Sequence, residues 1–278
     1  MIIGVAGLGL IGGSIVKSIK TRTQHTVYGI DKEPETMLFA RMSGAIDAEL
    51  NENNISECDL IFIALRPGTA VKWTEENAQF IKKNAIVIDI CGVKRSVEQR
   101  IAPIAKKHGF MYIGGHPMAG KERGGFVNSD AALFVGASMI LTPNEDTDMP
   151  MLEKLKALFI DMGFANLTFT TPDDHDRMIA FTSQLAHVIS SAYVKSPEAL
   201  KHRGFSAGSF NDMTRVARLD EDMWTELFLE NSDYLSQQLD ILICNLNEYK
   251  KAIDANDAEE LKKLLKDGKE KKAVAGGF

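Results

Sequence analysis

A glycine-rich turn at the start of the chain constrains its fold more than any other feature. The apolar run Met1–Ala6 leads into the sequence Gly7-Leu8-Gly9-Leu10-Ile11-Gly12. In a GxGxxG turn between a strand and a helix, the first glycine permits the tight turn and the second lets the backbone approach a pyrophosphate. The third lets the helix pack closely on the strand, and the free N–H groups at the helix N-terminus bind the anion. The segment therefore predicts a dinucleotide site. Its residues are Gly7, Gly9, Leu10, Ile11 and Gly12.

An acidic residue at the end of the second strand-like run indicates which dinucleotide binds. The run Val27–Ile30 is followed directly by Asp31. A carboxylate here accepts hydrogen bonds from the ribose hydroxyls and repels a 2′-phosphate, which favours NAD over NADP. The adjacent Lys32 could tolerate that phosphate, although an exposed lysine is usually only solvated. We therefore expect NAD as the cofactor.

The composition indicates an ordinary globular protein. The chain has 278 residues, 45% hydrophobic and 25% charged, which is long enough for two domains. Apolar runs such as Leu60–Leu65 are far shorter than the ~20 residues that cross a bilayer, and the N-terminus lacks a signal-peptide pattern. We therefore expect no membrane partner and a cytoplasmic location.

Charge and cysteine content exclude two further kinds of ligand. The net charge of −6 argues against nucleic acid, because phosphate contacts need a basic surface. An anionic small substrate must then be bound by local cations. Cys58, Cys91 and Cys244 are too few and too scattered for a disulfide framework or a zinc site, and no metal is expected.

Strand-like and helix-like segments alternate through the first half of the chain, as in a parallel sheet with crossover helices. Ligands bind beyond the carboxyl ends of such strands. This rule adds Arg66 and Pro67 to the candidate cofactor residues. We predict that residues 1–170 form an α/β, Rossmann-like domain with a parallel-rich sheet. After residues 1–6 and 27–30, its strands are expected within residues 60–65, 85–90, 111–113 and 138–141.

The pattern changes near residue 171. Thr171-Pro172-Asp173-Asp174 predicts a helix start with Thr171 as the N-cap, and long helical patterns without a convincing strand follow. Residues 171–278 are therefore predicted to form an all-α domain. Its first helix is apolar on most faces, which predicts burial on several sides. The many leucines between residues 222 and 250 predict a homodimer through this domain, unless they only close its own core.

Three charged or titratable residues outside the glycine turn are candidates for the chemistry. His116 is expected just past the strand at residues 111–113, where a histidine near the cofactor can accept a proton at neutral pH. Lys121 could meet a substrate carboxylate or could belong to a solvated loop. Arg215 offers a planar fork suited to a carboxylate, although such an arginine is more often a surface ion-pair partner.

A polar stripe lies on the otherwise apolar helix that starts at Thr171. Gln184 and His187 share one helix face with Ser183 and Ser191 by the three-and-four rule. Buried polar groups need partners, which either a binding cleft or neighbouring helices could supply. His175 lies twelve residues before His187 and on the opposite face, so the two are not expected to form one site.

Three further segments follow the glycine turn: His116-Pro117-Met118-Ala119-Gly120, Ser183-Gln184-Leu185-Ala186-His187 and Asp212-Met213-Thr214-Arg215. Together with the turn, they resemble the prephenate dehydrogenase family of tyrosine biosynthesis. The resemblance covers nearly the whole chain. It implies NAD-dependent oxidative decarboxylation of prephenate to 4-hydroxyphenylpyruvate, carbon dioxide and NADH. It also implies that His116 is the catalytic base, that Arg215 binds a substrate carboxylate, and that His187 lines the substrate pocket together with Gln184.

The chain departs from the family pattern at two positions. Gly92 stands where many members have a serine that helps the catalytic histidine hold the substrate hydroxyl, so this contact must come from elsewhere or from water. Asn211 stands where many relatives have a basic residue, four positions before the arginine. The candidate substitutes are Lys94, Lys121, Arg123 and Arg203.

Three other interpretations stay open. The substrate could be arogenate, which carries an amine where prephenate has a ketone, or both compounds could be used. A β-hydroxyacid dehydrogenase shares the domain order but typically relies on a lysine in the helical domain. A non-enzymatic dinucleotide sensor would leave His116 and Arg215 without a role.

Overall fold

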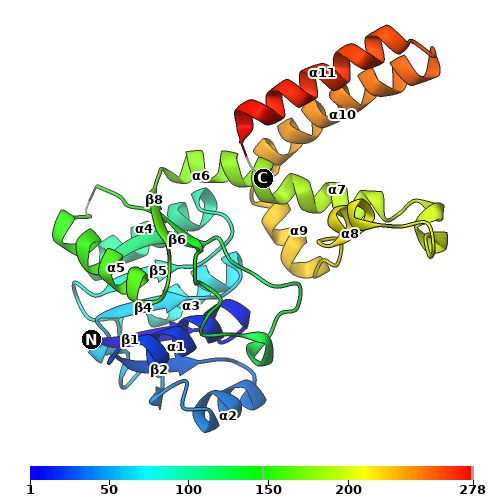
Figure 1. Ribbon diagram of the computed structural model, residues 1–278. Coiled ribbons are helices and arrows are strands. Elements are labelled where there is room, and N and C mark those ends of the chain that lie inside the picture. Colours follow the sequence, from blue (N-terminus) through cyan, green and yellow to red (C-terminus); the bar gives the residue numbers. More distant parts are fainter. Residues whose placement is uncertain (146, 277–278) are drawn as a thin grey trace. The chain divides into compact units, whose positions relative to one another are not determined.

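The computed structural model of the protein describes residues 1–145 and 147–276. The chain divides into two compact units, Met1–Asn231 and Ser232–Phe278. The first unit holds a sheet with its covering helices and a run of further helices (Figure 1). The second unit is a helical hairpin of α10 (Ser232–Asp254) and α11 (Ala258–Ala275).

The described part of the chain forms an eight-stranded sheet in the order β3-β2-β1-β4-β5-β6-β7-β8. Neighbouring strands are parallel except for β6 and β7, which are antiparallel. The parallel-rich sheet predicted from the alternating pattern is therefore confirmed. The strands are β1 (Ile2–Ala6), β2 (Thr26–Ile30), β3 (Ala48–Glu49), β4 (Leu60–Ile63), β5 (Ile86–Asp89), β6 (Met111–Pro117), β7 (Ser138–Thr142) and β8 (Asn166–Phe169).

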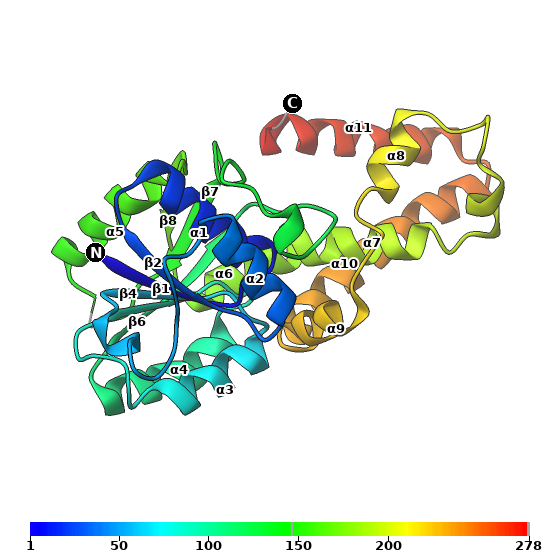
Figure 2. The ribbon, with the colours of Figure 1, turned by 90° about the horizontal axis from the view of Figure 1, so that it is seen from below.

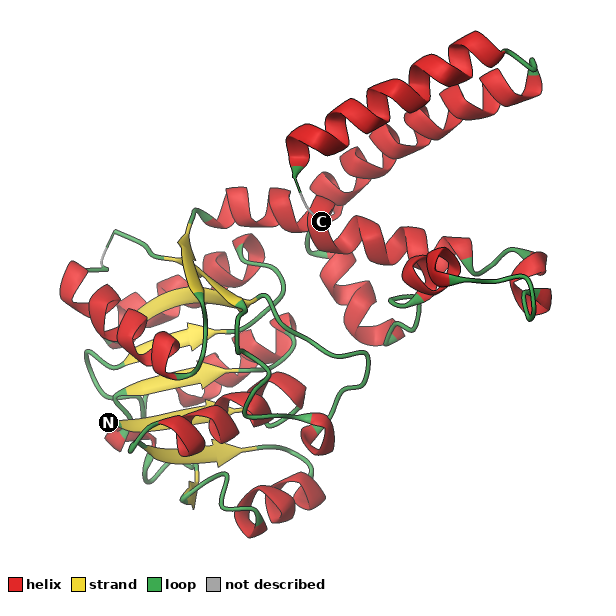
Figure 3. Ribbon diagram, in the orientation of Figure 1, coloured by secondary structure: helices red, strands yellow, loops and turns green. Residues whose placement is uncertain are grey.

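Helices cover both faces of the sheet because its central strands are apolar on both sides. In β4, Leu60 and Phe62 belong to one core cluster, and Ile61 and Ile63 to the other, as the alternation of side chains along a strand requires. Figures 2 and 3 show α1 and α5 on one face and α3 and α4 on the other. The helices of this region are α1 (Leu10–Arg22), α2 (Pro34–Met42), α3 (Pro67–Asn77), α4 (Arg95–His108) and α5 (Met149–Asp161).

The glycine turn has the geometry that its sequence predicts. Gly7 has a φ of +88°, in the left-handed region that favours glycine. A Cβ on Gly12 would overlap the backbone carbonyl of Gly7, so only glycine lets α1 approach the turn this closely. A Cβ on Gly9 would meet no atom within 4 Å, which leaves space above the turn.

The helices after the sheet begin where the sequence predicts. Thr171 Oγ1 accepts a hydrogen bond from the Asp174 N–H at 3.1 Å, which caps α6 (Pro172–Ile179). The chain continues as one π-helical turn (Ala180–Leu185) into α7 (Ala186–Tyr193), and α8 (Gly208–Thr214) and α9 (Glu221–Leu229) follow. Short 3-10 turns occupy Ile55–Glu57, Phe126–Asn128 and Pro197–Lys201.

Two expectations about the elements were wrong, and the edge strand β8 was not predicted. The strand predicted at residues 111–113 continues to Pro117, so His116 lies inside β6 and pairs with Ile140 of β7. The edge strand β8 is mostly exposed and gave no apolar signal. The first helix after residue 171 is not buried on several sides within one chain, since Met178 and Phe181 are 49% and 57% exposed. In the described residues, no helix is both long and apolar enough to cross a membrane.

Candidate active site

The parallel strands bring most of the predicted site residues to one edge of the sheet. Strands β1, β2, β4, β5 and β6 run in the same direction, so their carboxyl ends lie together. In the register of β5 and β6, Asp89 at the end of β5 is opposite Gly114, and His116 lies further along this edge. The residues that follow or end these strands include the glycine turn, Asp31, Arg66, Gly92 and His116.

The dinucleotide half of the site is formed by the glycine turn and Asp31. The Asp31 carboxylate accepts hydrogen bonds from the Leu8 N–H at 2.7 Å and from the Glu33 N–H at 3.0 Å. Each carboxylate oxygen can accept a second hydrogen bond, for example from a ribose hydroxyl. The N-terminus of α1 has no side-chain cap, and its first residues Leu10 and Ile11 are partly exposed. These residues fit a dinucleotide whose phosphates lie above the turn.

Arg66 and Pro67 lie at the start of α3. Pro67 is buried as the first residue of the helix. Arg66 Nη2 donates to Asp220 Oδ1 at 3.0 Å, and the two side chains are 43% and 56% exposed. Their contact with the cofactor stays a prediction.

A chain of three side chains leads from His116 into the interior. His116 Nδ1 lies 2.9 Å from His175 Nε2, and His175 Nδ1 lies 2.8 Å from Asp176 Oδ1. His116 is partly exposed, whereas His175 and Asp176 are buried. Sequence reasoning compared His175 only with His187 and missed this contact, because nothing in the helical spacing shows that α6 meets β6.

The Asp176 carboxylate also holds the N-terminus of α4. It accepts hydrogen bonds from the N–H groups of Lys94 at 2.8 Å and Arg95 at 3.0 Å, and from Arg95 Nε at 3.3 Å. α4 has no cap from its own N-cap residue, so Asp176 supplies the acceptor from α6. No local pattern could signal this cap, because the two elements are about 80 residues apart in the chain.

A buried ion pair lies beside the histidines. Lys94 Nζ contacts Asp89 Oδ1, and the Tyr112 hydroxyl donates to Asp89 Oδ2 at 2.7 Å. The Lys94 and Asp89 side chains are 1% and 0% exposed. Lys94 was one of four candidate substitutes for the basic residue that Asn211 replaces, and it does not fit this role because its ammonium group is buried against Asp89.

The surroundings keep both histidines neutral. Burial, then the nearby His175 and the positive charge of Lys94, lower the pKa of His116 well below its usual range. Burial also lowers the pKa of His175, although the hydrogen bond with Asp176 opposes this shift. A neutral histidine has one nitrogen lone pair that can accept a proton. His116 therefore has the protonation state that a general base needs at neutral pH.

His187 and Arg215 lie on the helical side. His187 Nδ1 is 2.8 Å from the Ser183 carbonyl oxygen, and its ring packs on Trp224 with centroids 4.0 Å apart. Burial lowers the pKa of His187, and the charge of Arg215 adds to this effect. Arg215 Nη1 forms an ion pair with Glu122 Oε1 at 3.2 Å, with more than half of both side chains exposed. The two residues are thus within electrostatic reach of each other.

Gln184 and His187 both face α9. Gln184 Nε2 donates to the Leu227 carbonyl at 3.0 Å, and His187 packs on Trp224 of the same helix. The Oε1 of Gln184 accepts from Asn231 Nδ2 at 2.8 Å, and the side chain is 2% exposed. Of the two kinds of partner that the polar stripe left open, neighbouring residues of the chain therefore satisfy Gln184.

Lys121 and Gly92 occupy different surroundings. Lys121 Nζ donates to the Asn128 carbonyl at 3.2 Å and pairs with Asp130 at 3.3 Å, within its own loop. A Cβ on Gly92 would meet only the methyl groups of Leu227, at 3.3 and 3.6 Å, so a small side chain would nearly fit.

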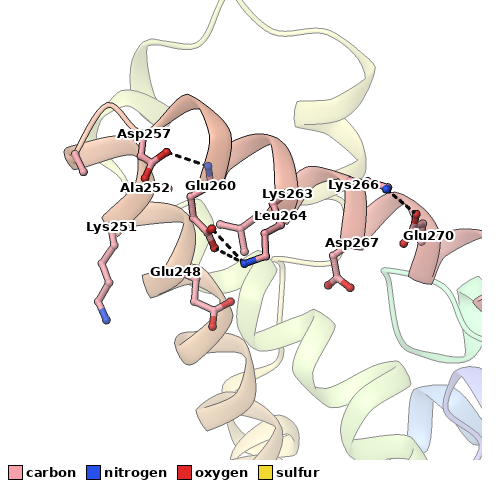
Figure 4. A pocket seen from close by; sticks show the side chains of 11 residues that line it. Glu248, Lys251, Ala252, Asp257, Glu260, Lys263, Leu264, Lys266, Asp267 and Glu270 are labelled. Atoms are coloured by element: carbon pink, nitrogen blue, oxygen red, sulfur yellow. Dashed lines mark hydrogen bonds and ion pairs between the residues drawn. The ribbon is translucent and has the colours of Figure 1, made fainter.

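A groove of about 740 Å³ in the second unit contains none of these residues. It lies between α10 and α11, and charged side chains from both helices line it (Figure 4). Five acidic and three basic side chains line it, and Lys263 pairs with Glu260 and Lys266 with Glu270. The acidic excess makes the groove unsuited to an anionic ligand.

Family models match both parts of the chain. The model described as prephenate dehydrogenase, nucleotide-binding domain, matches residues 15–166. The model described as prephenate dehydrogenase, dimerization domain, matches residues 171–267.

Individual proteins are similar over almost the full length. The prephenate dehydrogenase of Bacillus subtilis is 29% identical over 275 residues, which cover 96% of this chain and 74% of the relative. The crystal structure of Aquifex aeolicus prephenate dehydrogenase in complex with hydroxyphenyl propionate and NAD+ has a TM-score of 0.87 at 28% identity, covering 99% of this chain and 98% of that one. The Synechocystis arogenate dehydrogenase structure has a TM-score of 0.82 at 26% identity, covering 99% and 100%.

The buried ion pair predicts a large effect of replacing Lys94. Lys94→Met leaves the buried Asp89 carboxylate without its counter-charge, which should lower the free energy of unfolding by about 3–5 kcal/mol. Lys82→Met is the matched control, because Lys82 pairs with Asp59 at 2.5 Å while both side chains are about 40% exposed. This surface pair should contribute at most ~1 kcal/mol. Chemical denaturation measures both changes, and equally small losses in the two variants would contradict the importance of the buried pair.

Proposed function

The chain belongs to the prephenate dehydrogenase family, and from this premise we propose that it catalyses the NAD-dependent oxidative decarboxylation of prephenate. The products are 4-hydroxyphenylpyruvate, carbon dioxide and NADH. One observation carries the proposal most directly. A neutral His116 lies at the same sheet edge as the glycine turn, and His175 binds its Nδ1.

The cofactor is assigned to the turn at residues 7–12. Backbone N–H groups of the turn and the α1 N-terminus would hold the pyrophosphate, and Asp31 would accept the ribose hydroxyls. Arg66 and Pro67 would lie on the next stretch of the same edge. NAD, when bound, supplies the acceptor for the hydride that prephenate loses.

The substrate is assigned to the space between His116 and the helical residues. His116 would hold the ring hydroxyl and accept its proton while the carbon becomes carbonyl-like. Loss of the ring carboxylate as carbon dioxide restores aromaticity and leaves a phenolate oxygen. This oxygen would take the proton back from His116, so no additional acid is needed. Arg215 would bind one carboxylate through its planar fork, Lys121 would supply a further positive charge, and His187 would line the pocket.

Two predicted substrate residues have a more indirect role in this proposal. Both the nitrogen and the oxygen of the Gln184 amide bond to other residues of the chain. This supports a role for Gln184 in positioning α9 and Asn231. Gly92 contributes no side chain, so a water molecule or the backbone would take the place of the family's serine. Both assignments follow from the surroundings of the two residues within the chain.

Arogenate is the second candidate substrate. The similarity to the Synechocystis arogenate dehydrogenase supports it, whereas both family models and the Bacillus subtilis relative support prephenate. Arogenate carries an amine on the side chain where prephenate carries a ketone.

We also propose a homodimer through the helical region. The match to a dimerization domain over residues 171–267 supports it, as do exposed apolar side chains on α6 and the following turn. Sedimentation at micromolar concentration should give twice the mass of 30.6 kDa. A strict monomer would contradict this assembly.

The boundary between an NAD-binding domain (1–170) and a helical domain (171–278) stays a prediction, as does the cytoplasmic location.

The proposed reaction predicts NADH formation that depends on a neutral His116. Purified protein with NAD should produce NADH from prephenate, from arogenate or from both, and the ratio of kcat/KM values identifies the substrate.

His116→Asn should lower kcat by about 10² or more. Because protonation removes the base, kcat/KM should fall as the pH drops through the pKa of His116, and this fall should lie below the ordinary value of 6.5. No turnover with either substrate would contradict the proposed function, and a near-normal His116→Asn variant would contradict the base.

Asp31 is expected to determine the preference for NAD over NADP. Asp31→Asn removes the negative charge that repels a 2′-phosphate and should raise kcat/KM for NADP relative to NAD by about tenfold. Glu33→Gln is the matched control, since it removes a carboxylate of the same charge two residues away, on a side chain that is 62% exposed. An unchanged ratio in Asp31→Asn, or an equal change in both variants, would show that Asp31 does not discriminate.

A further inference from the structure

We infer that His175 and Asp176 are positioning residues that fix the tautomer of His116 and leave its Nε2 as the nitrogen that accepts the substrate's proton. This role rests on the proposed function, in which His116 is the general base. It concerns two residues that sequence reasoning did not place in the site.

Asp176 is the fixed end of the chain of hydrogen bonds. Its carboxylate faces the Lys94 N–H, the Arg95 N–H, Arg95 Nε and His175 Nδ1. The two backbone amides and the guanidinium can only donate to it, and such donors favour the ionised carboxylate. An ionised carboxylate only accepts hydrogen bonds. His175 must therefore carry a proton on Nδ1.

The proton on His175 determines the proton on His116. A neutral His175 with a proton on Nδ1 has only a lone pair on Nε2. His116 Nδ1 lies 2.9 Å from this lone pair, and two lone pairs at that distance would repel each other. His116 Nδ1 must therefore donate a hydrogen, which leaves the lone pair of His116 on Nε2.

The surrounding charges oppose the one protonation state that would reverse this order. A doubly protonated His175 could donate from Nε2 and force His116 into the other tautomer. His175 is 2% exposed, and the ammonium group of Lys94 lies near both histidines. A second positive charge at this buried position would be unfavourable. Asp89, which pairs with Lys94, is the other charged group from β5 that faces this region.

The same arrangement balances the charge when the base acts. The O–H bond of the substrate hydroxyl breaks, an Nε2–H bond forms on His116, and the ring becomes an imidazolium. His175 and Asp176 exchange no proton with the substrate in this step. The negative charge of Asp176, reached through His175, stabilises the new positive charge, as an orienting carboxylate does in a histidine-based triad.

The positioning residues are themselves held rigidly. Asp176 is tied to the start of α4 by two backbone N–H groups, and Asn231 Nδ2 donates to the Asp176 carbonyl at 2.8 Å. Arg95 Nη2 in turn donates to Asn231 Oδ1 at 3.0 Å. The ring of His175 therefore keeps its direction toward β6 without help from a substrate.

Two substitutions of His175 separate positioning from mere packing. His175→Phe fills the space but removes the acceptor for His116 Nδ1, and kcat should fall at least about tenfold while KM changes little. His175→Gln keeps a carbonyl oxygen as an acceptor and should recover most of kcat. His108→Phe, at the end of α4 and away from the site, is the control for a histidine-to-phenylalanine change and should keep normal activity. An unchanged kcat in His175→Phe would overturn the inference.

A second measurement reads the tautomer directly and needs no substrate. Long-range ¹H–¹⁵N correlation spectra of the full chain with ¹⁵N-labelled histidine resolve which nitrogen of each of the six histidines carries the proton. The signals that vanish in His116→Asn belong to His116. They should show a proton on Nδ1 at neutral pH, and a proton on Nε2 in the wild-type protein would overturn the inference even if the His175 variants fail to fold. A wild-type protein with the expected tautomer but no turnover would contradict the proposed function alone.

Discussion

The buried carboxylate of Asp176 is the interaction on which the site depends. A charge without solvent costs several kcal/mol unless hydrogen bonds compensate it, and here two backbone N–H groups, a guanidinium and an imidazole do so. These donors come from the start of α4 and from α6 itself. The carboxylate therefore joins the first helix after the sheet to the loop after β5. The same contact that stabilises the fold also places His175 against His116.

A second buried charge, the pair of Asp89 and Lys94, sets the electrostatic surroundings of the histidines. The positive charge of Lys94 contributes to the lowered pKa of His116 and of His175, whereas Asp176 compensates it only on the His175 side. His116 is thus kept neutral, while the negative charge of Asp176, reached through His175, can stabilise its protonated form. Lys94 has this effect without touching the solvent, so a residue that resembles a substrate ligand in the sequence acts from the interior.

Local signals in the sequence predicted a large part of this arrangement. The contacts between distant segments could not be predicted from such signals. Gly7, Gly12 and the Thr171 cap are determined by backbone geometry within a few residues, so their patterns were readable. The contact of His116 with His175 joins residues 59 positions apart, and no periodicity reports it. Gln184 likewise bonds to Leu227 and Asn231, which are 43 and 47 positions away, so the helical pattern could not show whether a cleft or the chain itself would satisfy this side chain.

A crystal structure of the protein with NAD and an unreactive prephenate analogue would show which nitrogen of His116 faces the substrate. The ring oxygen of the analogue should lie within about 2.6–3.2 Å of His116 Nε2, with His175 still bound to Nδ1. The analogue's carboxylate should lie against Arg215 on the helical side. A ring oxygen out of reach of His116, or a His116 ring that turns Nδ1 toward the analogue and releases His175, would contradict this arrangement.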